Sequence, residues 1–228
     1  MWAGSILGST ATFVTLFTGF LIGLSNGVNV LVARFYGAGH PKDVSKTVHS
    51  ALLVSLAAGV LLLFVGLFGS PALLELLNTK EDLLPGAILY LRVYFLGMPA
   101  LALYNFGNAV FSAIGETKKP LAYLSFAGVL NILLNLFFVI VLKMNVNGVA
   151  IATVLSNAVS SVLLLRRLLH GDLVRVELKQ LRIDPAIFRK IMRIGLPAGI
   201  QSAIFSVSNI IIQSAINSLG TVVMAASS

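Results

Sequence analysis

The stretch SFAGVLNILLNLFFVIVL, residues 125–142, has no charged residue, yet Asn131 and Asn135 lie in its middle. A helix needs about 20 mainly apolar residues to cross a bilayer core, so this run predicts a membrane helix. Polar side chains in such a helix are costly and usually face a bundle interior or a cavity. Because the two amides are four residues apart, they share one face of the helix.

The composition of the whole chain agrees with a lipid environment. Of its 228 residues 57% are hydrophobic and 11% charged, with a mean hydropathy of +0.96, whereas soluble domains carry about 25% charged residues. Cysteine is absent, which excludes a disulfide framework and a thiolate metal site. We expect no cofactor.

Six stretches are apolar enough to span a membrane, and they are continuously apolar rather than alternating, which favours helices over a barrel. They are Ala11–Ala33, Val48–Leu74, Gly86–Ile114, Leu121–Leu142, Val146–Leu165 and Ile194–Leu219. The predicted fold class is all-α, a polytopic membrane bundle of about six transmembrane helices. Pro99 and Pro197 are candidate helix breaks, although membrane helices also tolerate proline.

The basic residues are distributed unevenly between the linkers. Thirteen of the sixteen lysines and arginines lie in linkers 34–49, 115–120 and 166–193, which alternate with nearly uncharged ones. By the positive-inside rule these three linkers are cytoplasmic. The expected location is the plasma membrane, with multiple passes. The net charge of +8 is therefore a topology signal, and no nucleic-acid partner is expected. The long linker 166–193 is either an amphipathic surface segment or a solvated tether.

Polar side chains recur at helical spacing in five of the six predicted helices. The stripes are Ser25, Asn26 and Asn29; Tyr104, Asn105, Asn108 and Ser112; Ser125, Gly128, Asn131 and Asn135; Thr153, Ser156, Asn157, Ser160 and Ser161; and Ser202, Ser206, Asn209, Gln213 and Asn217. Each stripe alone is explained equally well by helix packing, but five together favour a lined cavity. The steps Gly19, Gly23, Gly27 and Gly195, Gly199 predict close helix packing.

The sequence does not suggest an enzyme. Its three histidines are scattered at or near predicted cytoplasmic linkers, and no acidic residue lies centrally in a predicted span. A carboxylate pair for acid–base catalysis is therefore missing. A glycine-rich phosphate loop with a lysine is also missing, which argues against an ATPase. A passive cavity or a carrier fits these residues better.

Four segments resemble the multidrug and toxic compound extrusion (MATE) transporters, prokaryotic DinF-like branch. They are GLSNGVNVLVARFYGAGHPKDV (23–44), YLRVYFLGMPALALYNFGNAVFSAIGETKKPLAY (90–123), GVAIATVLSNAVSS (148–161) and IGLPAGIQSAIFSVSNIIIQSAINSLGTVVMAASS (194–228). The resemblance implies a twelve-helix fold of two six-helix lobes, of which this chain would hold helices two to seven. It implies first-lobe helices over 1–165, a cytoplasmic inter-lobe linker over 166–193, and the first, truncated helix of the second lobe over 194–228. We therefore expect an incomplete portion of a longer protein that does not transport alone and needs the rest of the second lobe.

The resemblance also implies a function: export of amphiphilic or cationic compounds in exchange for Na⁺ or H⁺, by alternating access of the two lobes. The small-molecule substrate and membrane lipid are then the partners. Matching the family's cation site assigns Asn131, Asn135 and Thr153 to cation binding, with no metal expected beyond Na⁺. At Asn135 the family has an acid, and its further acid on the first helix lies outside this chain. An amide oxygen can ligate Na⁺ but cannot carry a proton.

The predicted substrate cavity takes its residues from the polar stripes: Asn26, Tyr104, Asn105, Asn108, Asn157 and Asn209. Two alternatives remain open. One is a lipid-linked saccharide flippase of the same superfamily, which would need cavity cations, whereas Arg92 lies near an outer helix end. The other is a degenerate half-protein that does not transport.

Overall fold

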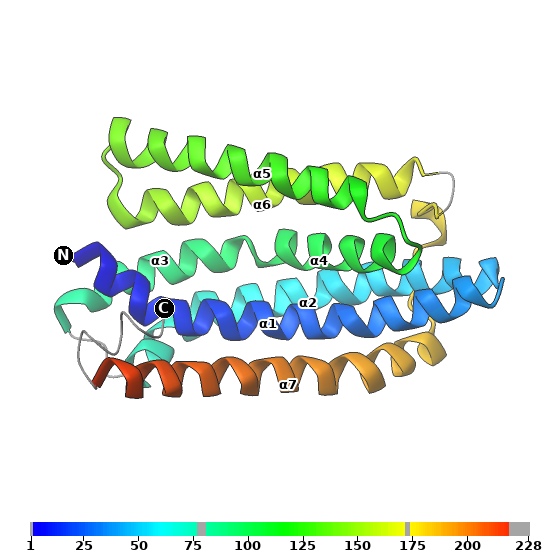
Figure 1. Ribbon diagram of the computed structural model, residues 1–228, viewed down its shortest axis with the longest axis horizontal. Helices are drawn as coiled ribbons and strands as arrows, with labels where there is room; N and C mark the ends of the chain where they lie inside the picture. Colours follow the sequence, from blue (N-terminus) through cyan, green and yellow to red (C-terminus); the bar gives the residue numbers. More distant parts are fainter. Residues whose placement is uncertain (1, 77–80, 172–173, 219–228) are drawn as a thin grey trace.

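The computed structural model describes residues 2–76, 81–171 and 174–218, and these form a bundle of long helices without a strand (Figure 1). The α-helices are α1 (Trp2–Gly37), α2 (Pro41–Leu76), α3 (Leu84–Leu96), α4 (Met98–Ala113), α5 (Lys118–Leu136), α6 (Asn145–Leu169) and α7 (Pro185–Ser218). Short helical turns occur at Glu81–Leu83, Phe137–Val141 and Leu178–Gln180. The predicted all-α class is confirmed.

The helices agree with the predicted spans except at the third and the last. Within the described residues four helices are long and apolar enough to cross a membrane, and α3 with α4 counts as a fifth span bent by 44°. Helix α7, which contains the predicted sixth span, is not among them, and Leu219 lies outside the described residues. The expected break at Pro99 is confirmed, because this proline follows the break at Gly97 and cannot donate a backbone hydrogen bond. Pro197 lies inside an unbroken α7.

Helices extend into both ends of the predicted linker 166–193. Helix α6 continues to Leu169, and α7 already begins at Pro185. Asp184 explains the early start, because its Oδ1 accepts hydrogen bonds from the backbone N–H groups of Ala186 (2.9 Å) and Ile187 (3.1 Å). An aspartate cap followed by proline at the first helical position is a strong helix start. Residues 219–228 of the predicted last segment lie outside the described residues.

The three basic linkers lie at one end of the bundle. Figure 1 places the α1–α2 loop, the α4–α5 loop and the α6–α7 connection at the right-hand end, whereas the α5–α6 connection and the start of α3 lie at the left. Alternate connections therefore lie at opposite ends, as the charge pattern predicts. We refer to the end with the basic linkers as the cytoplasmic end.

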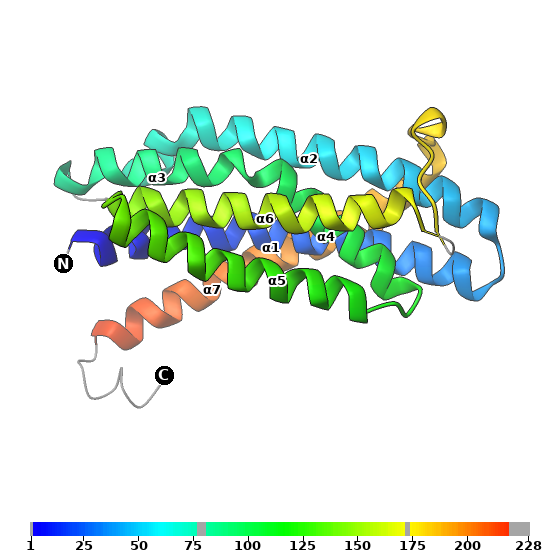
Figure 2. The same ribbon diagram turned by 90° about the horizontal axis from the view of Figure 1, so that it is seen from above.

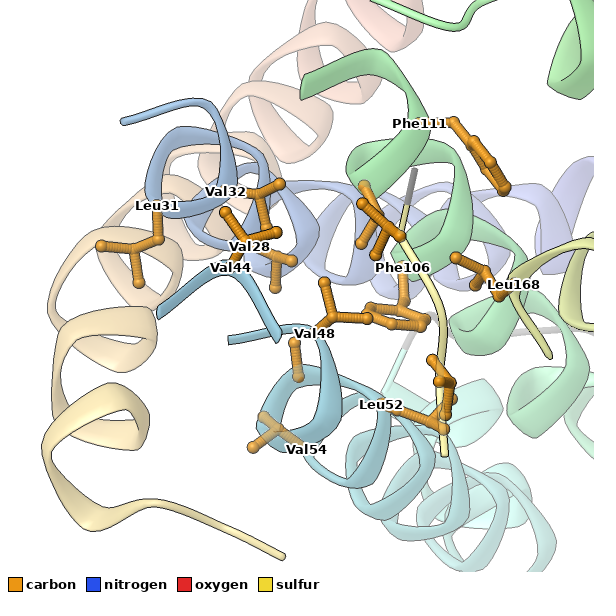
Figure 3. Close-up of a cluster of buried hydrophobic side chains, with 14 of the residues drawn as sticks. Val28, Leu31, Val32, Val44, Val48, Leu52, Val54, Phe106, Phe111 and Leu168 are labelled. Atoms are coloured by element: carbon orange, nitrogen blue, oxygen red, sulfur yellow. The ribbon is translucent and has the colours of Figure 1, made fainter. Parts of the chain in front are cut away.

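Two clusters of buried side chains form the core. The larger one joins α1, α2, α4 and α6 through residues such as Val28, Val48, Phe106 and Leu168 (Figure 3). The second lies around Phe95 and Leu91, which are fully buried. Helix α5 is peripheral and packs chiefly on α6, and most of its apolar residues are not buried.

Helices α1 and α7 approach each other through glycines. A Cβ atom on Gly23 would lie 2.4 Å from the Cα of Gly199, and one on Gly27 would lie 2.7 Å from the backbone nitrogen of Gly195. Both distances are shorter than atoms can approach, so backbone lies directly against backbone, which confirms the predicted close packing. Figure 2 shows α7 leaving the bundle toward its C-terminal end. We call this contact the glycine crossing.

Candidate functional site

The structure brings together the three residues predicted to bind a cation. On α5, Asn131 Nδ2 donates hydrogen bonds to two hydroxyls of α6, Ser156 Oγ at 3.2 Å and Thr153 Oγ1 at 3.4 Å. Asn135 Nδ2 donates to Asn131 Oδ1 at 2.9 Å, one helical turn away. We call Asn131, Asn135, Thr153 and Ser156 the amide cluster.

One oxygen of the amide cluster is unused. Asn135 Oδ1 is buried and has no hydrogen-bond partner among the described residues, whereas the hydroxyls of Thr153 and Ser156 donate to carbonyls of their own helix, at 2.9 and 3.0 Å. Both hydroxyls keep lone pairs that can accept or ligate. Hard cations such as Na⁺ prefer oxygen ligands, so the cluster offers amide and hydroxyl oxygens suited to one.

The amide cluster contains no titratable group. Helices α5 and α6 carry no acidic side chain, and the described residues hold no group of three histidine, cysteine or acidic side chains suited to a metal ion. Neither Asn131 nor Asn135 can take up or release a proton at ordinary pH. The cluster can therefore hold a cation or a water molecule, but it cannot carry a proton on its own side chains.

A second polar feature is a cavity of about 220 Å³ between α1 and α4. It is lined by Ile22, Ser25, Asn26, Asn29, Asn105, Asn108, Ala109 and Ser112. Asn29 Nδ2 donates to the carbonyl of Ala109 and Asn105 Nδ2 to that of Leu101, both at 2.9 Å. The lining thus combines four amides and two hydroxyls with no charge, and we call it the amide cavity.

Three of the six predicted substrate residues line the amide cavity: Asn26, Asn105 and Asn108. The other three lie elsewhere. Tyr104 is 9% exposed and belongs to the larger hydrophobic cluster. Asn157 is half-buried on α6, where its backbone carbonyl accepts a hydrogen bond from Ser160, and Asn209 is exposed on α7.

The structure adds residues that the predicted sites left out. Ser156 joins the amide cluster, and Ser25, Asn29 and Ser112 join the amide cavity. All four belong to the polar stripes of the sequence, so helical spacing was the feature from which they could have been predicted. The stripes give the face on which a side chain lies, but they do not tell which helix that face meets.

An ionic contact at the cytoplasmic end connects the α4–α5 loop to α6. Glu116 Oε1 lies 2.9 Å from Lys119 Nζ and 3.4 Å from Arg167 Nη2. The hydrogen bond from Lys119 is the main cause that lowers the pKa of Glu116 below its usual value, and Arg167 lowers it further. Glu116 therefore stays ionised and keeps the end of α6 next to the loop that precedes α5.

Comparisons with known proteins agree with this architecture. A model of the MatE family matches residues 3–137. The chain is 29% identical to a probable multidrug resistance protein of Bacillus subtilis (strain 168), over 96% of this chain and 51% of that protein. It thus spans about half the length of the curated relatives that it matches.

Solved structures give the same picture. An inward-facing multidrug resistance MATE family transporter of the MOP superfamily superposes with a TM-score of 0.86 at 24% identity, covering 93% of this chain and 49% of that one. An outward-facing structure with the same description gives 0.85 at 25% identity, covering 92% and 47%. The arrangement of the helices is therefore similar to half of each of these two transporters.

Proposed function

Because the chain belongs to the MatE family, we propose that the whole protein exports small amphiphilic or cationic compounds in exchange for a cation, by alternating access of two lobes. Members of this family are transporters rather than enzymes, and they are multi-pass proteins of the plasma membrane. The relative from Bacillus subtilis is described as a probable multidrug resistance protein, which supports a broad range of exported compounds.

The observation that carries the proposal is the amide cavity. Its volume of about 220 Å³ is below the roughly 300–1,000 Å³ typical of pockets for drug-sized ligands. We infer that it forms one wall of a larger cavity, to which the second lobe contributes the rest. An uncharged lining of amides and hydroxyls can bind cationic or neutral compounds without the desolvation of a fixed charge.

We propose Na⁺ as the coupling ion and the amide cluster as its site. The supporting observations are the unused oxygen of Asn135 and the two hydroxyls beside it. Removing a buried acceptor's partner costs about 1–3 kcal/mol, so a bound cation that Asn135 ligates would compensate for the missing hydrogen bond. Cation binding would then bias the rocking of the lobes.

Efflux by the intact protein in proteoliposomes, driven by a Na⁺ gradient, tests this site. Asn135→Leu removes the free oxygen, so we expect export to fall at least tenfold, which corresponds to about 1.4 kcal/mol. Asn135→Asp keeps an oxygen and adds a titratable group, so export should persist and become dependent on pH. Parent-like efflux by both variants would show that the amide cluster is not the coupling site.

The flippase alternative has less support. A carrier of anionic lipid-linked sugars needs cations in its cavity, whereas the amide cavity has no charged lining residue. Arg92 lies on α3, is exposed, and donates from Nε to the carbonyl of Leu67 at 3.1 Å. Arg92 is not one of the residues that line the amide cavity. It lies on α3, which begins at the end of the bundle opposite the cytoplasmic end (Figure 1).

A further inference from the structure

A cavity of about 510 Å³ lies at the cytoplasmic end, between the start of α2 and the segment that leads into α7. It is separate from the amide cluster and from the amide cavity. Its lining residues are Lys42, Ser45, Lys46, His49, Ser50, Lys179, Gln180, Leu181, Arg182 and Asp184. We call it the basic cavity.

Hydrogen bonds to a buried serine hold the two walls of the basic cavity against each other. Ser50 is fully buried, and its hydroxyl donates to the carbonyl of Arg182 at 3.3 Å and accepts from the N–H of Asp184 at 3.0 Å. Two hydrogen bonds to one buried hydroxyl leave the 182–184 segment little freedom to move away from α2. The cavity is therefore formed before any ligand arrives.

His49 makes a second connection between the same two elements. It is 3% exposed, its Nε2 lies 2.9 Å from the N–H of Glu177, and its Nδ1 lies 2.7 Å from the carbonyl of Ser45. The Glu177 N–H donates to Nε2, which puts a ring N–H on Nδ1, where it donates to the carbonyl of Ser45. His49 thus holds the linker against α2.

The charges in the basic cavity are unbalanced. Four lining residues are cations: Lys42, Lys46, Lys179 and Arg182. All four are exposed, and none of them forms a salt bridge within the residues that the structure describes. The single acid in the lining, Asp184, caps α7. The hydrogen bond from the Ile187 N–H is the main cause that lowers its pKa, and the charges of Lys46 and Arg182 lower it further.

We propose that the basic cavity binds a phosphate-bearing anion, supplied by the headgroup of an anionic phospholipid in the inner leaflet. Four cations and one carboxylate leave the lining with a net positive charge, which favours an anion, and lysine binds phosphate as a point charge. The volume falls in the roughly 300–1,000 Å³ range of organic ligands. Basic pockets at the cytoplasmic ends of membrane helices bind the headgroups of anionic lipids. A bound headgroup would connect the start of α2 to the linker before α7.

The test uses the intact protein and two charge-matched double variants. Lys46→Gln with Arg182→Gln removes two cations from opposite walls of the cavity. Lys118→Gln with Arg166→Gln removes two exposed cations from other cytoplasmic positions. Native mass spectrometry of protein taken from phosphatidylglycerol–phosphatidylcholine nanodiscs then measures the lipid retained. A lysine or arginine beside an anionic headgroup contributes about a fivefold effect, so we expect roughly 30-fold weaker phosphatidylglycerol binding in the cavity variant. Lys118 and Arg166 do not line the cavity, so the control should bind the retained lipid about as well as the parent.

A titration with inorganic phosphate distinguishes the two sources of the anion. If the occupant is a lipid, the cavity variant binds phosphatidylglycerol more weakly than the parent and the control do. Millimolar phosphate then does not displace the lipid from the parent protein. Binding of phosphate alone, lost in the cavity variant, would support the anion class and refute the lipid source. Equal loss of binding in both variants, or binding of neither ligand by the parent, would overturn the proposal. None of these results depends on the protein's transport activity.

Discussion

The unpaired oxygen of Asn135 is the residue-scale feature on which the amide cluster depends. A buried acceptor without a partner costs about 1–3 kcal/mol, and the cluster leaves that one acceptor open while its other polar groups are used within α5 and α6. A cluster that served only to hold the two helices together would have no need of a free acceptor. The free oxygen therefore favours a ligand role over packing alone.

Asp184 allows a prediction with a defined pH dependence. Its pKa is lowered in the folded protein, first by the hydrogen bond from the Ile187 N–H. A lowered carboxyl pKa stabilises the fold at neutral pH, and the stabilisation is lost as the pH falls through the folded-state pKa. Asp184→Ala should therefore give faster amide exchange in the first turn of α7 at neutral pH, measured by hydrogen–deuterium exchange mass spectrometry.

The matched control for this prediction is Asp184→Asn. Its side chain still offers an oxygen to cap the helix, but that oxygen does not titrate. In the asparagine variant we expect protection close to the parent at neutral pH and no additional loss of protection on acidification. Equal exchange in the parent and the alanine variant would show that the cap does not determine where α7 begins.

Residue types and spacing predicted the amide cluster only in part. The four-residue step placed Asn131 and Asn135 on one face, and the family resemblance added Thr153, but neither singled out Ser156 as a partner. Only some of the predicted substrate residues line one cavity, because polar faces on separate helices do not have to face each other. Asn26, Asn105 and Asn108 came together across α1 and α4, whereas Tyr104 turned into the apolar core. Contacts between helices depend on packing that no single helix encodes.

At the scale of elements, the two prolines have different outcomes for a physical reason. Pro99 follows Gly97, where the helix bends and α6 comes close: a Cβ on Gly97 would lie 2.9 Å from Val154 Cγ2. Pro197 lies between Gly195 and Gly199, both of which contact α1. The glycine crossing supports α7 on either side of Pro197, so the helix stays continuous. Proline marks where a helix can bend, and the neighbouring helices decide whether it does.

The glycine crossing gives a prediction with a control elsewhere in the chain. Gly23→Ala places a methyl group within 2.4 Å of backbone, so α1 and α7 must separate, at a cost of about 1–3 kcal/mol by analogy with overpacked cores. Gly128→Ala on α5 meets no atom within 4 Å, and alanine is the better helix former by up to about 1 kcal/mol.

Unfolding of the intact protein in mixed micelles of increasing SDS content measures both effects. We expect the transition to occur at lower SDS for Gly23→Ala and to stay or move slightly higher for Gly128→Ala. Similar shifts in the two variants would mean that the crossing contributes no specific packing energy.

At the scale of the whole molecule, the charge pattern fixes which end of the bundle faces the cytoplasm. The chain contains no cysteine, so single cysteines can report topology. Lys118 and Lys143 are both exposed and lie at opposite ends of α5 and its continuation. In intact cells a membrane-impermeant maleimide should label Lys143→Cys and should leave Lys118→Cys unlabelled until the membrane is permeabilised. The reverse pattern would invert the orientation and place the basic cavity outside.

The glycine crossing also limits how this protein can vary. Every amino acid other than glycine has a Cβ atom, and at Gly23 that atom would fall on the backbone of α7. A saturation library at Gly23 should therefore contain no neutral replacement, whereas the open position Gly128 should accept many. Sequence variation is therefore easier at open positions than at the crossing, where any new side chain alters the spacing of two helices at once.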